Sequence, residues 1–62
     1  MTNDHAEINH LMHQGVLAIQ RNQFPQALHF FDLVITKEPT FAEAWNKRAM
    51  TYYLMENYHS MI

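Results

Sequence analysis

Apolar residues recur every three or four positions in three successive segments of the chain. This is the spacing of an amphipathic helix, and it predicts helices over about 5–20, 25–37 and 41–55. Glu56-Asn57 interrupts the third pattern and predicts the end of that helix. The linkers are short, so neighbouring helices are expected to pack antiparallel. The pattern therefore predicts an all-α fold of three antiparallel helices.

Prolines and polar residues mark the ends of the second and third segments. Pro25 suits the first turn of a helix, where its missing N–H leaves no partner unpaired. Pro39 indicates the end of the second segment, because the residue before a proline is pushed out of the helical region. Thr40 and Glu43 have the spacing of a capping box, which predicts that the third helix starts directly after Thr40.

The chain also contains an internal repeat. Four pairs of residues lie 34 positions apart: Leu11 and Trp45, Gly15 and Ala49, Ala18 and Tyr52, and Phe24 and Tyr58. The first and last pairs match large with large, and the second matches small with small. A period of 34 residues built from two helices is typical of tetratricopeptide repeats.

The sequence resembles the tetratricopeptide repeat family over nearly its whole length. Besides the paired positions, the first repeat has the A-x3-F spacing of Ala27 and Phe31, followed by Pro39. The resemblance implies a helical-repeat, or α-solenoid, fragment in which residues 1–62 form one unit. Residues 8–41 are its full repeat, and 42–62 are a partial second one.

The resemblance also carries expectations about packing. The small residues Gly15 and Ala49 are expected where the two helices of a pair cross closely. Phe31 and Trp45 are expected to fill the remaining space as large anchors. The chain departs from the family at Gln14 and Arg48, where leucine is usual, and at Met61, where the first repeat has Ala27.

Composition narrows the class of protein further. The 62 residues include no cysteine, which excludes disulfides and thiolate metal sites, so stability must come from helix packing or association. Hydrophobic residues make up 48% of the chain, which favours a folded domain. The four basic residues are scattered and the net charge is −2, so the sequence contains no basic patch of the kind that binds nucleic acid. No apolar run is long enough to cross a membrane, and the polar start is no secretory signal, so a cytoplasmic location is expected.

The predicted third helix has apolar residues on more than one face. Solenoid repeats bury such faces against neighbouring repeats, and about three repeats are normally needed for stability. Two explanations remain open: the chain is a fragment of a longer repeat scaffold, or it forms a homodimer or higher homo-oligomer, for which domain swapping is one route. The residues expected to take part in self-association are Trp45, Tyr52, Leu54, Met55, Tyr58 and Met61.

The resemblance further implies a concave groove, lined by the first helix of each repeat, that binds an extended or helical peptide. The positions that correspond to this groove are Asn9, Met12, Val16, Ile19, Glu43, Asn46, Met50 and Tyr53. In the alternative interpretation, Met12, Ile19, Met50 and Tyr53 are simply core or dimer contacts. The expected partner is thus a protein or peptide, or a second copy of the chain.

Other chemistry has little support in the sequence. His10 and His13 are neighbours on a helix and lie near His5, which raises a zinc or nickel site as a distant alternative, but the spacing matches no named motif. There is no glycine-rich phosphate loop and no HExxH motif. We therefore expect no enzyme, no cofactor and no metal. The sequence favours a protein–protein interaction module, with a purely structural oligomerisation element or scaffold fragment as the alternative.

Overall fold

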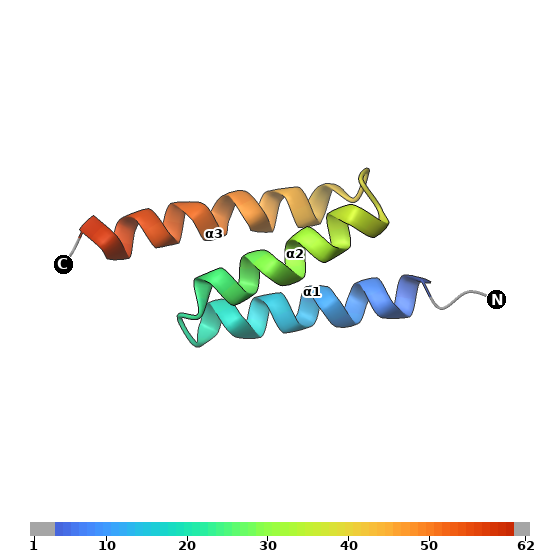
Figure 1. Cartoon of the computed structure of the whole chain (residues 1–62), viewed down its shortest axis with the longest axis horizontal. Helices are drawn as coiled ribbons and strands as arrows, with labels where there is room; N and C mark the ends of the chain where they lie inside the picture. Colours follow the sequence, from blue (N-terminus) through green and yellow to red (C-terminus); the bar gives the residue numbers. More distant parts are fainter. Residues whose placement is uncertain (1–3, 61–62) are drawn as a thin grey trace.

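A computed structural model of the chain describes residues 4–60, with side chains described for residues 5–57, and contains three helices in this range. Helix α1 spans Asp4–Gln20, α2 spans Phe24–Lys37 and α3 spans Ala42–Ser60. Neighbouring helices run in opposite directions, so α1 and α3 run the same way (Figure 1). Within the described residues there is no strand. The predicted all-α fold of three antiparallel helices is confirmed.

The turn between α1 and α2 is fixed by backbone hydrogen bonds at the end of α1. The N–H of Gln23 donates to the carbonyl of Ala18 at 2.8 Å, and the N–H of Asn22 donates to the carbonyl of Ile19 at 2.9 Å. This pair of bonds is the Schellman motif, which requires one residue in the left-handed region. Asn22 takes that place with φ 61°, a conformation that asparagine tolerates better than most residues. The chain therefore reverses within three residues.

Both predictions drawn from the prolines are confirmed. Pro25 lies in the first turn of α2. At the other end, α2 stops at Lys37, and the N–H of Glu38 donates to the carbonyl of Val34 at 2.8 Å, directly before Pro39.

The predicted capping box at the start of α3 is not formed. The helix begins at Ala42 rather than directly after Thr40, and among the described residues neither Thr40 nor Glu43 makes a side-chain hydrogen bond. Instead, the indole N–H of Trp45 donates to the carbonyl of Pro39 at 2.7 Å. This bond ties the incoming loop to the second turn of the helix.

Helix α3 continues past Glu56-Asn57 to Ser60, so the predicted end of this helix is wrong. Neither residue breaks a helix: glutamate has a high helix propensity, and asparagine costs only a fraction of 1 kcal/mol. No proline or glycine stands between Asn57 and Ser60 to stop the helix. The polar pair interrupts the apolar stripe without interrupting the backbone.

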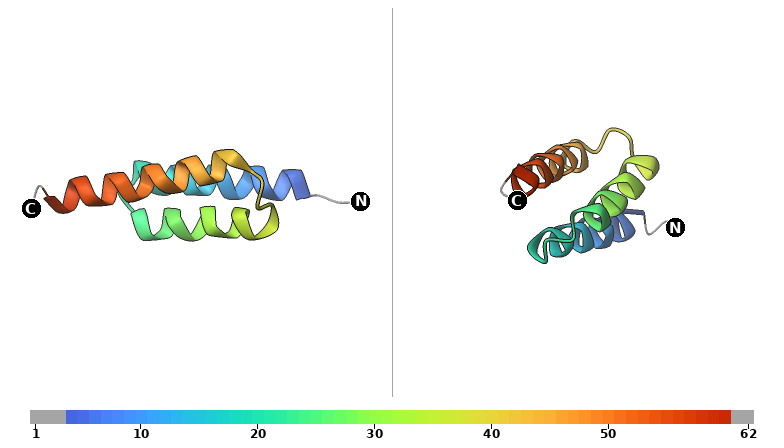
Figure 2. Two further views of the ribbon diagram at one scale, coloured as in Figure 1. Left: turned by 90° about the horizontal axis from the view of Figure 1, so that it is seen from above. Right: turned by 60° about the vertical axis from the view of Figure 1, so that its left-hand side comes forward.

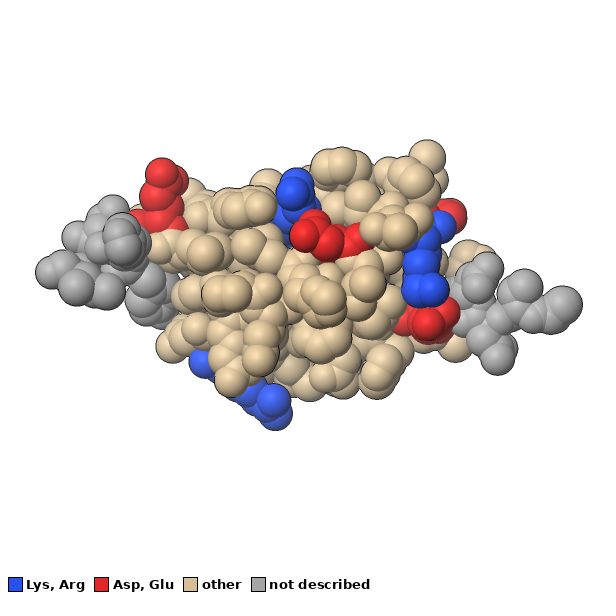
Figure 3. All heavy atoms as spheres, in the orientation of Figure 1, with Lys and Arg blue, Asp and Glu red and all other residues tan. Residues whose placement is uncertain are grey.

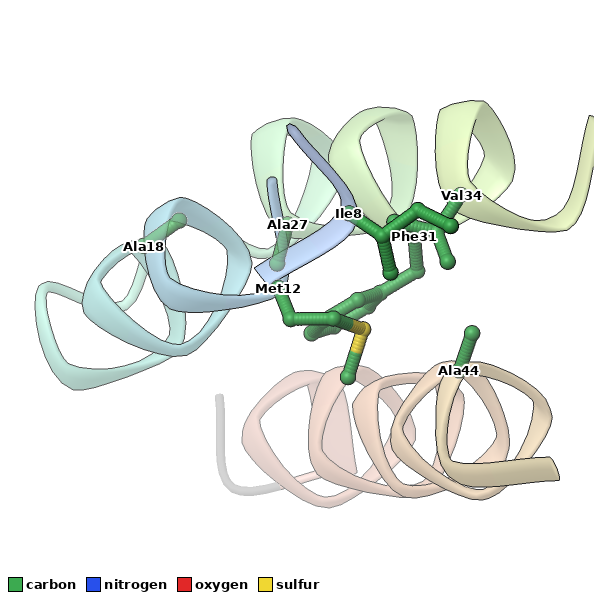
Figure 4. Packing of buried hydrophobic residues seen from close by; sticks show 7 residues of the cluster. All are labelled: Ile8, Met12, Ala18, Ala27, Phe31, Val34 and Ala44. Carbon is green, nitrogen blue, oxygen red and sulfur yellow. The ribbon is translucent and has the colours of Figure 1, made fainter. Parts of the chain in front are cut away.

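The core lies around α2, which packs against both α1 and α3 (Figures 1 and 2). Phe31 and Val34 of α2 are fully buried, as is Ala44 of α3. Figure 4 shows the side chain of Met12 extending from α1 towards α3 beside the ring of Phe31. One hydrophobic cluster therefore joins all three helices; its buried members are Ile8, Met12, Ala18, Ala27, Phe31, Val34 and Ala44.

The close crossing predicted at Gly15 is confirmed. Gly15 is buried, and a Cβ atom added there would come within 2.7 Å of Phe31 Cζ and nearer still to Cε1. Because the ring of Phe31 is fully buried, it has little room to move away. Helices α1 and α2 can approach this closely only because residue 15 has no side chain.

The corresponding expectation for Ala49 is wrong for this structure. Ala49 is exposed, and Trp45 keeps 46% of its surface exposed rather than filling a core. The physical reason is simple: within the described residues no helix follows α3, so nothing crosses it at Ala49. Ala49 and Trp45, which correspond to Gly15 and Leu11 of the first repeat, are therefore exposed to solvent.

Two ion pairs between described residues connect α2 to its neighbours. Lys37 Nζ lies 3.3 Å from Glu7 Oε1 of α1, and Arg48 Nε of α3 lies 2.8 Å from Asp32 Oδ1. Both pairs are partly solvent-exposed, so each contributes little to stability. Of the helices described, none combines the length and the apolar character needed to cross a membrane.

Candidate interaction surface

Helix α3 turns one line of side chains towards α2. Ala44 and Thr51 on this line are fully buried. The hydroxyl of Thr51 donates to the carbonyl of Lys47 at 2.7 Å, so this buried polar group is satisfied within its own helix. The inward side of α3 is thus packed at Ala44 and Thr51, with no unsatisfied polar group at Thr51.

A second line of side chains on α3 is exposed from Ala42 to Glu56. We call this the outer face and define it by Ala42, Trp45, Ala49, Tyr52 and Glu56, all of them exposed. These residues are three or four positions apart, so they form one stripe along the helix. The outer face places a small residue between two large aromatic residues.

Arg48 lies at the edge of the outer face and contacts both aromatic residues. Its guanidinium carbon is 5.9 Å from the ring centroid of Trp45 and 5.3 Å from that of Tyr52, within the range of cation–π attraction. Its Nε donates to Asp32 Oδ1 at 2.8 Å. Arg48 is half-buried, at a position where the family usually has leucine. Through these contacts it holds the two exposed rings close to α2.

The residues predicted for the groove differ in how far their side chains are exposed and accessible to a partner. Five of them are exposed: Asn9, Glu43, Asn46, Met50 and Tyr53. Val16 and Ile19 are half-buried on α1, whereas Met12 is buried in the core cluster. The burial of Met12 agrees with the alternative interpretation, in which it is a core residue. On α3, Asn46, Met50 and Tyr53 form a second exposed stripe beside the outer face, which we call the groove side.

The residues predicted for self-association are also divided. Trp45 and Tyr52 are exposed on the outer face, with 46% and 48% of their surfaces accessible. Leu54 and Met55 are half-buried, so they offer less surface to a second copy. Met61 and the side chain of Tyr58 lie outside the described residues.

Arg48 and Ala49 were not among the residues predicted for an interaction surface. Arg48 was noted only as a departure from the family, although its spacing of three and four from Trp45 and Tyr52 places it beside both on a helix. Ala49 was assigned to a buried crossing. Its position between two aromatic residues was the signal that it belongs with them on the outer face.

Charged residues are sparse on the face shown in Figure 3, where basic groups lie directly beside acidic ones and broad areas of the surface carry no charge. A hollow of about 380 Å³ lies on α2, lined by Pro25, Gln26, His29 and Phe30, and includes none of the predicted groove residues. Among the described residues, no three histidine or carboxylate side chains gather closely enough to hold a metal ion.

The fold and these surfaces define a class of protein: a small all-α helical-repeat unit with an exposed aromatic face. Over 53 residues, 86% of the chain, it is 43% identical to a TPR repeat-containing protein of Rhizobium etli. Together with the three-helix arrangement, this relative confirms the resemblance to the tetratricopeptide repeat family. The chain spans about a quarter (26%) of the relative's length. No family model and no solved structure matches the chain.

Proposed function

We propose that this chain is a protein–protein interaction module rather than an enzyme, with residues 8–41 as one repeat and 42–62 as part of a second. The observation that carries the proposal is the exposure of aromatic and methionine side chains on two sides of α3, although its inward side is already packed. Exposed apolar surface of this kind usually marks an interface. The name of the Rhizobium etli relative supports the same class of function.

One partner is a peptide or helical segment that binds on the groove side. Met50 is 39% exposed and Tyr53 63% exposed, and Asn46 beside them can both donate and accept hydrogen bonds. Val16 and Ile19 extend this surface onto α1, where both are half-buried. An apolar surface flanked by amides suits a partner segment that is itself apolar and uncharged.

The composition of this surface also predicts how binding depends on salt. Glu43 is the one charged residue among those predicted for the groove, and no lysine or arginine is among them. Coulomb attraction therefore contributes little, and affinity should change little between low and physiological ionic strength. A partner that is held by its terminal carboxylate does not fit this set of residues.

Self-association is the second part of the proposal. The outer face offers Trp45 and Tyr52, two residue types that are common in the energetic centre of interfaces. If the outer face is the only surface that binds, the chain is a structural oligomerisation element instead. The two functions differ in which side of α3 is needed.

A peptide-array experiment tests binding on the groove side. An array of 15-residue peptides would be probed with the fluorescently labelled chain, and hits would be titrated in solution. We expect Met50→Ala and Asn46→Ala to weaken binding of the hits by about fivefold or more, corresponding to roughly 1 kcal/mol. Gln26→Ala, an exposed change on α2, is the matched control. Equal effects of all three variants, or an array without hits, would contradict the proposed groove.

A further inference from the structure

The residues predicted for the groove change in character along α1 and α3. Met12 is buried in the core cluster, and the other residues divide into two groups. The polar group is exposed and consists of Asn9, Glu43 and Asn46. The apolar group is exposed or half-buried and consists of Val16, Ile19, Met50 and Tyr53.

The fold keeps the two groups apart. Counted from Asp4 in α1 and from Ala42 in α3, each polar residue lies within the first six positions of its helix, and each apolar residue lies at the ninth position or later. Because α1 and α3 run in the same direction, their first turns lie at the same end of the molecule (Figure 1). The surface is therefore polar at one end and apolar at the other.

We propose that this surface selects a partner segment whose apolar side chains are grouped at one end, and whose other end carries uncharged side chains that form hydrogen bonds. Serine, threonine, asparagine and glutamine are the residue types that fit the second description. The inference rests on the proposed function and deepens it, because it names the order of residue types in the partner. The apolar group of the partner lies over Met50 and Tyr53, and its polar group over Asn9 and Asn46.

At the apolar end, the driving force is the removal of exposed apolar surface from water. Tyr53 is 63% exposed and Met50 39% exposed, and binding gains free energy in proportion to the apolar area that is buried. Tyrosine is also common among the residues that carry most of the energy of an interface. Apolar side chains of the partner are therefore most favourable at this end.

At the polar end, two side-chain amides oppose the same apolar side chains. Among the described residues, the amides of Asn9 and Asn46 make no hydrogen bond within the chain, so each is free to donate and accept. An apolar group placed over them would remove their water without replacing its hydrogen bonds, which is unfavourable. This cost rejects the reversed placement, and it makes the order of residues in the partner part of its recognition.

The charges at the polar end favour a partner without charge. Glu43 is exposed, and Lys47 of the opposite charge lies four positions later, one turn along the same helix. The two charges leave this end without a net charge that would attract an acidic or a basic residue. An uncharged polar group in the partner also agrees with the weak dependence on salt predicted for this surface.

The helix geometry sets the spacing of the two groups in the partner. Asn46 and Tyr53 are seven residues apart on α3, which is about 10 Å along the helix. An extended segment covers this distance in about three residues. The centres of the apolar and polar groups should therefore be about three residues apart in an extended partner.

The array-selected peptides test the order of residues directly. We expect the hits to have their apolar residues grouped at one end. Each hit would be compared with a peptide of the same composition in which apolar and polar residues alternate, and we expect the alternating peptide to bind at least about tenfold more weakly. Hits without the grouped arrangement, or equal affinities of the two peptides, would overturn the inference.

Double-mutant cycles test which end of the surface holds which group. Replacing the apolar residues of a hit by alanine should abolish the effect of Tyr53→Ala on its affinity and keep the effect of Asn46→Ala. Replacing the polar residues should do the reverse, and Gln26→Ala on α2 should have no effect with any of these peptides. If the hits bind but both variants respond equally to each replacement, this inference fails and the proposed groove stands. An array without hits would contradict both.

Discussion

At the scale of single residues, the packing of α1 on α2 depends on Gly15 and Phe31. A Cβ at position 15 would lie within 2.7 Å of Phe31 Cζ, and the ring is fully buried. The sequence predicted a close crossing at Gly15, because a small residue recurs 34 positions later at Ala49, and it predicted Phe31 as a large anchor, but it did not pair the two residues. The bond of Arg48 to Asp32 could not be predicted in the same way, since these two residues lie on different helices.

We predict that Gly15→Ala lowers the free energy of unfolding by about 1–2 kcal/mol, because overpacking against Phe31 outweighs the better helix propensity of alanine. Urea denaturation followed by circular dichroism measures the change. His10→Ala, at an exposed position of the same helix, is the control and should change stability little. A Gly15→Ala variant that is more stable than the original chain would contradict the close crossing.

Asn22 gives a second prediction at this scale, because its φ of 61° lies in the left-handed region. We expect Asn22→Val to destabilise the fold by about 1–2 kcal/mol, since a β-branched residue is strained there. Asn22→Gly should be neutral or stabilising. The two variants would be compared by thermal unfolding, and similar melting temperatures for both would argue against the Schellman turn.

At the scale of elements, the three helices were predictable and their ends less so. Hydrophobic periodicity placed each helix because one face of each is buried. The end of α3 was predicted wrongly because the polar pair Glu56-Asn57 breaks the apolar stripe, whereas a helix backbone is stopped by proline, glycine or a cap. The exposed face of α3 contributes to this wrong prediction of the helix end. Residues on that face are not packed, so they do not add to the apolar periodicity from which the helix was predicted.

The continuation of α3 predicts a specific difference between two variants at Asn57. Inside a helix, alanine is more favourable than glycine by about 1 kcal/mol, whereas in a turn glycine is tolerated equally well or better. Asn57→Ala should therefore raise the helical circular dichroism signal and the stability, and Asn57→Gly should lower both. The reverse order would place the end of α3 at Glu56-Asn57 after all.

At the scale of the whole molecule, α3 separates two surfaces. In the proposed arrangement, its groove side faces the same way as exposed residues of α1, and its outer face is a separate exposed stripe. The sequence predicted residues of both surfaces, because exposed aromatic and methionine side chains stand out in a small chain. It could not show whether Met12 lines the groove or the core, since the burial of Met12 depends on the cluster that joins the three helices in space.

The most direct test of two separate surfaces on α3 is amide chemical-shift mapping by ¹⁵N NMR. Dilution of the chain alone should move signals of Trp45, Ala49 and Tyr52, whereas addition of an array-selected peptide at low protein concentration should move those of Asn46, Met50 and Val16. That pattern is the result we predict. If dilution and peptide addition move the same signals, or if neither moves signals of α3, the account of two interaction surfaces is contradicted.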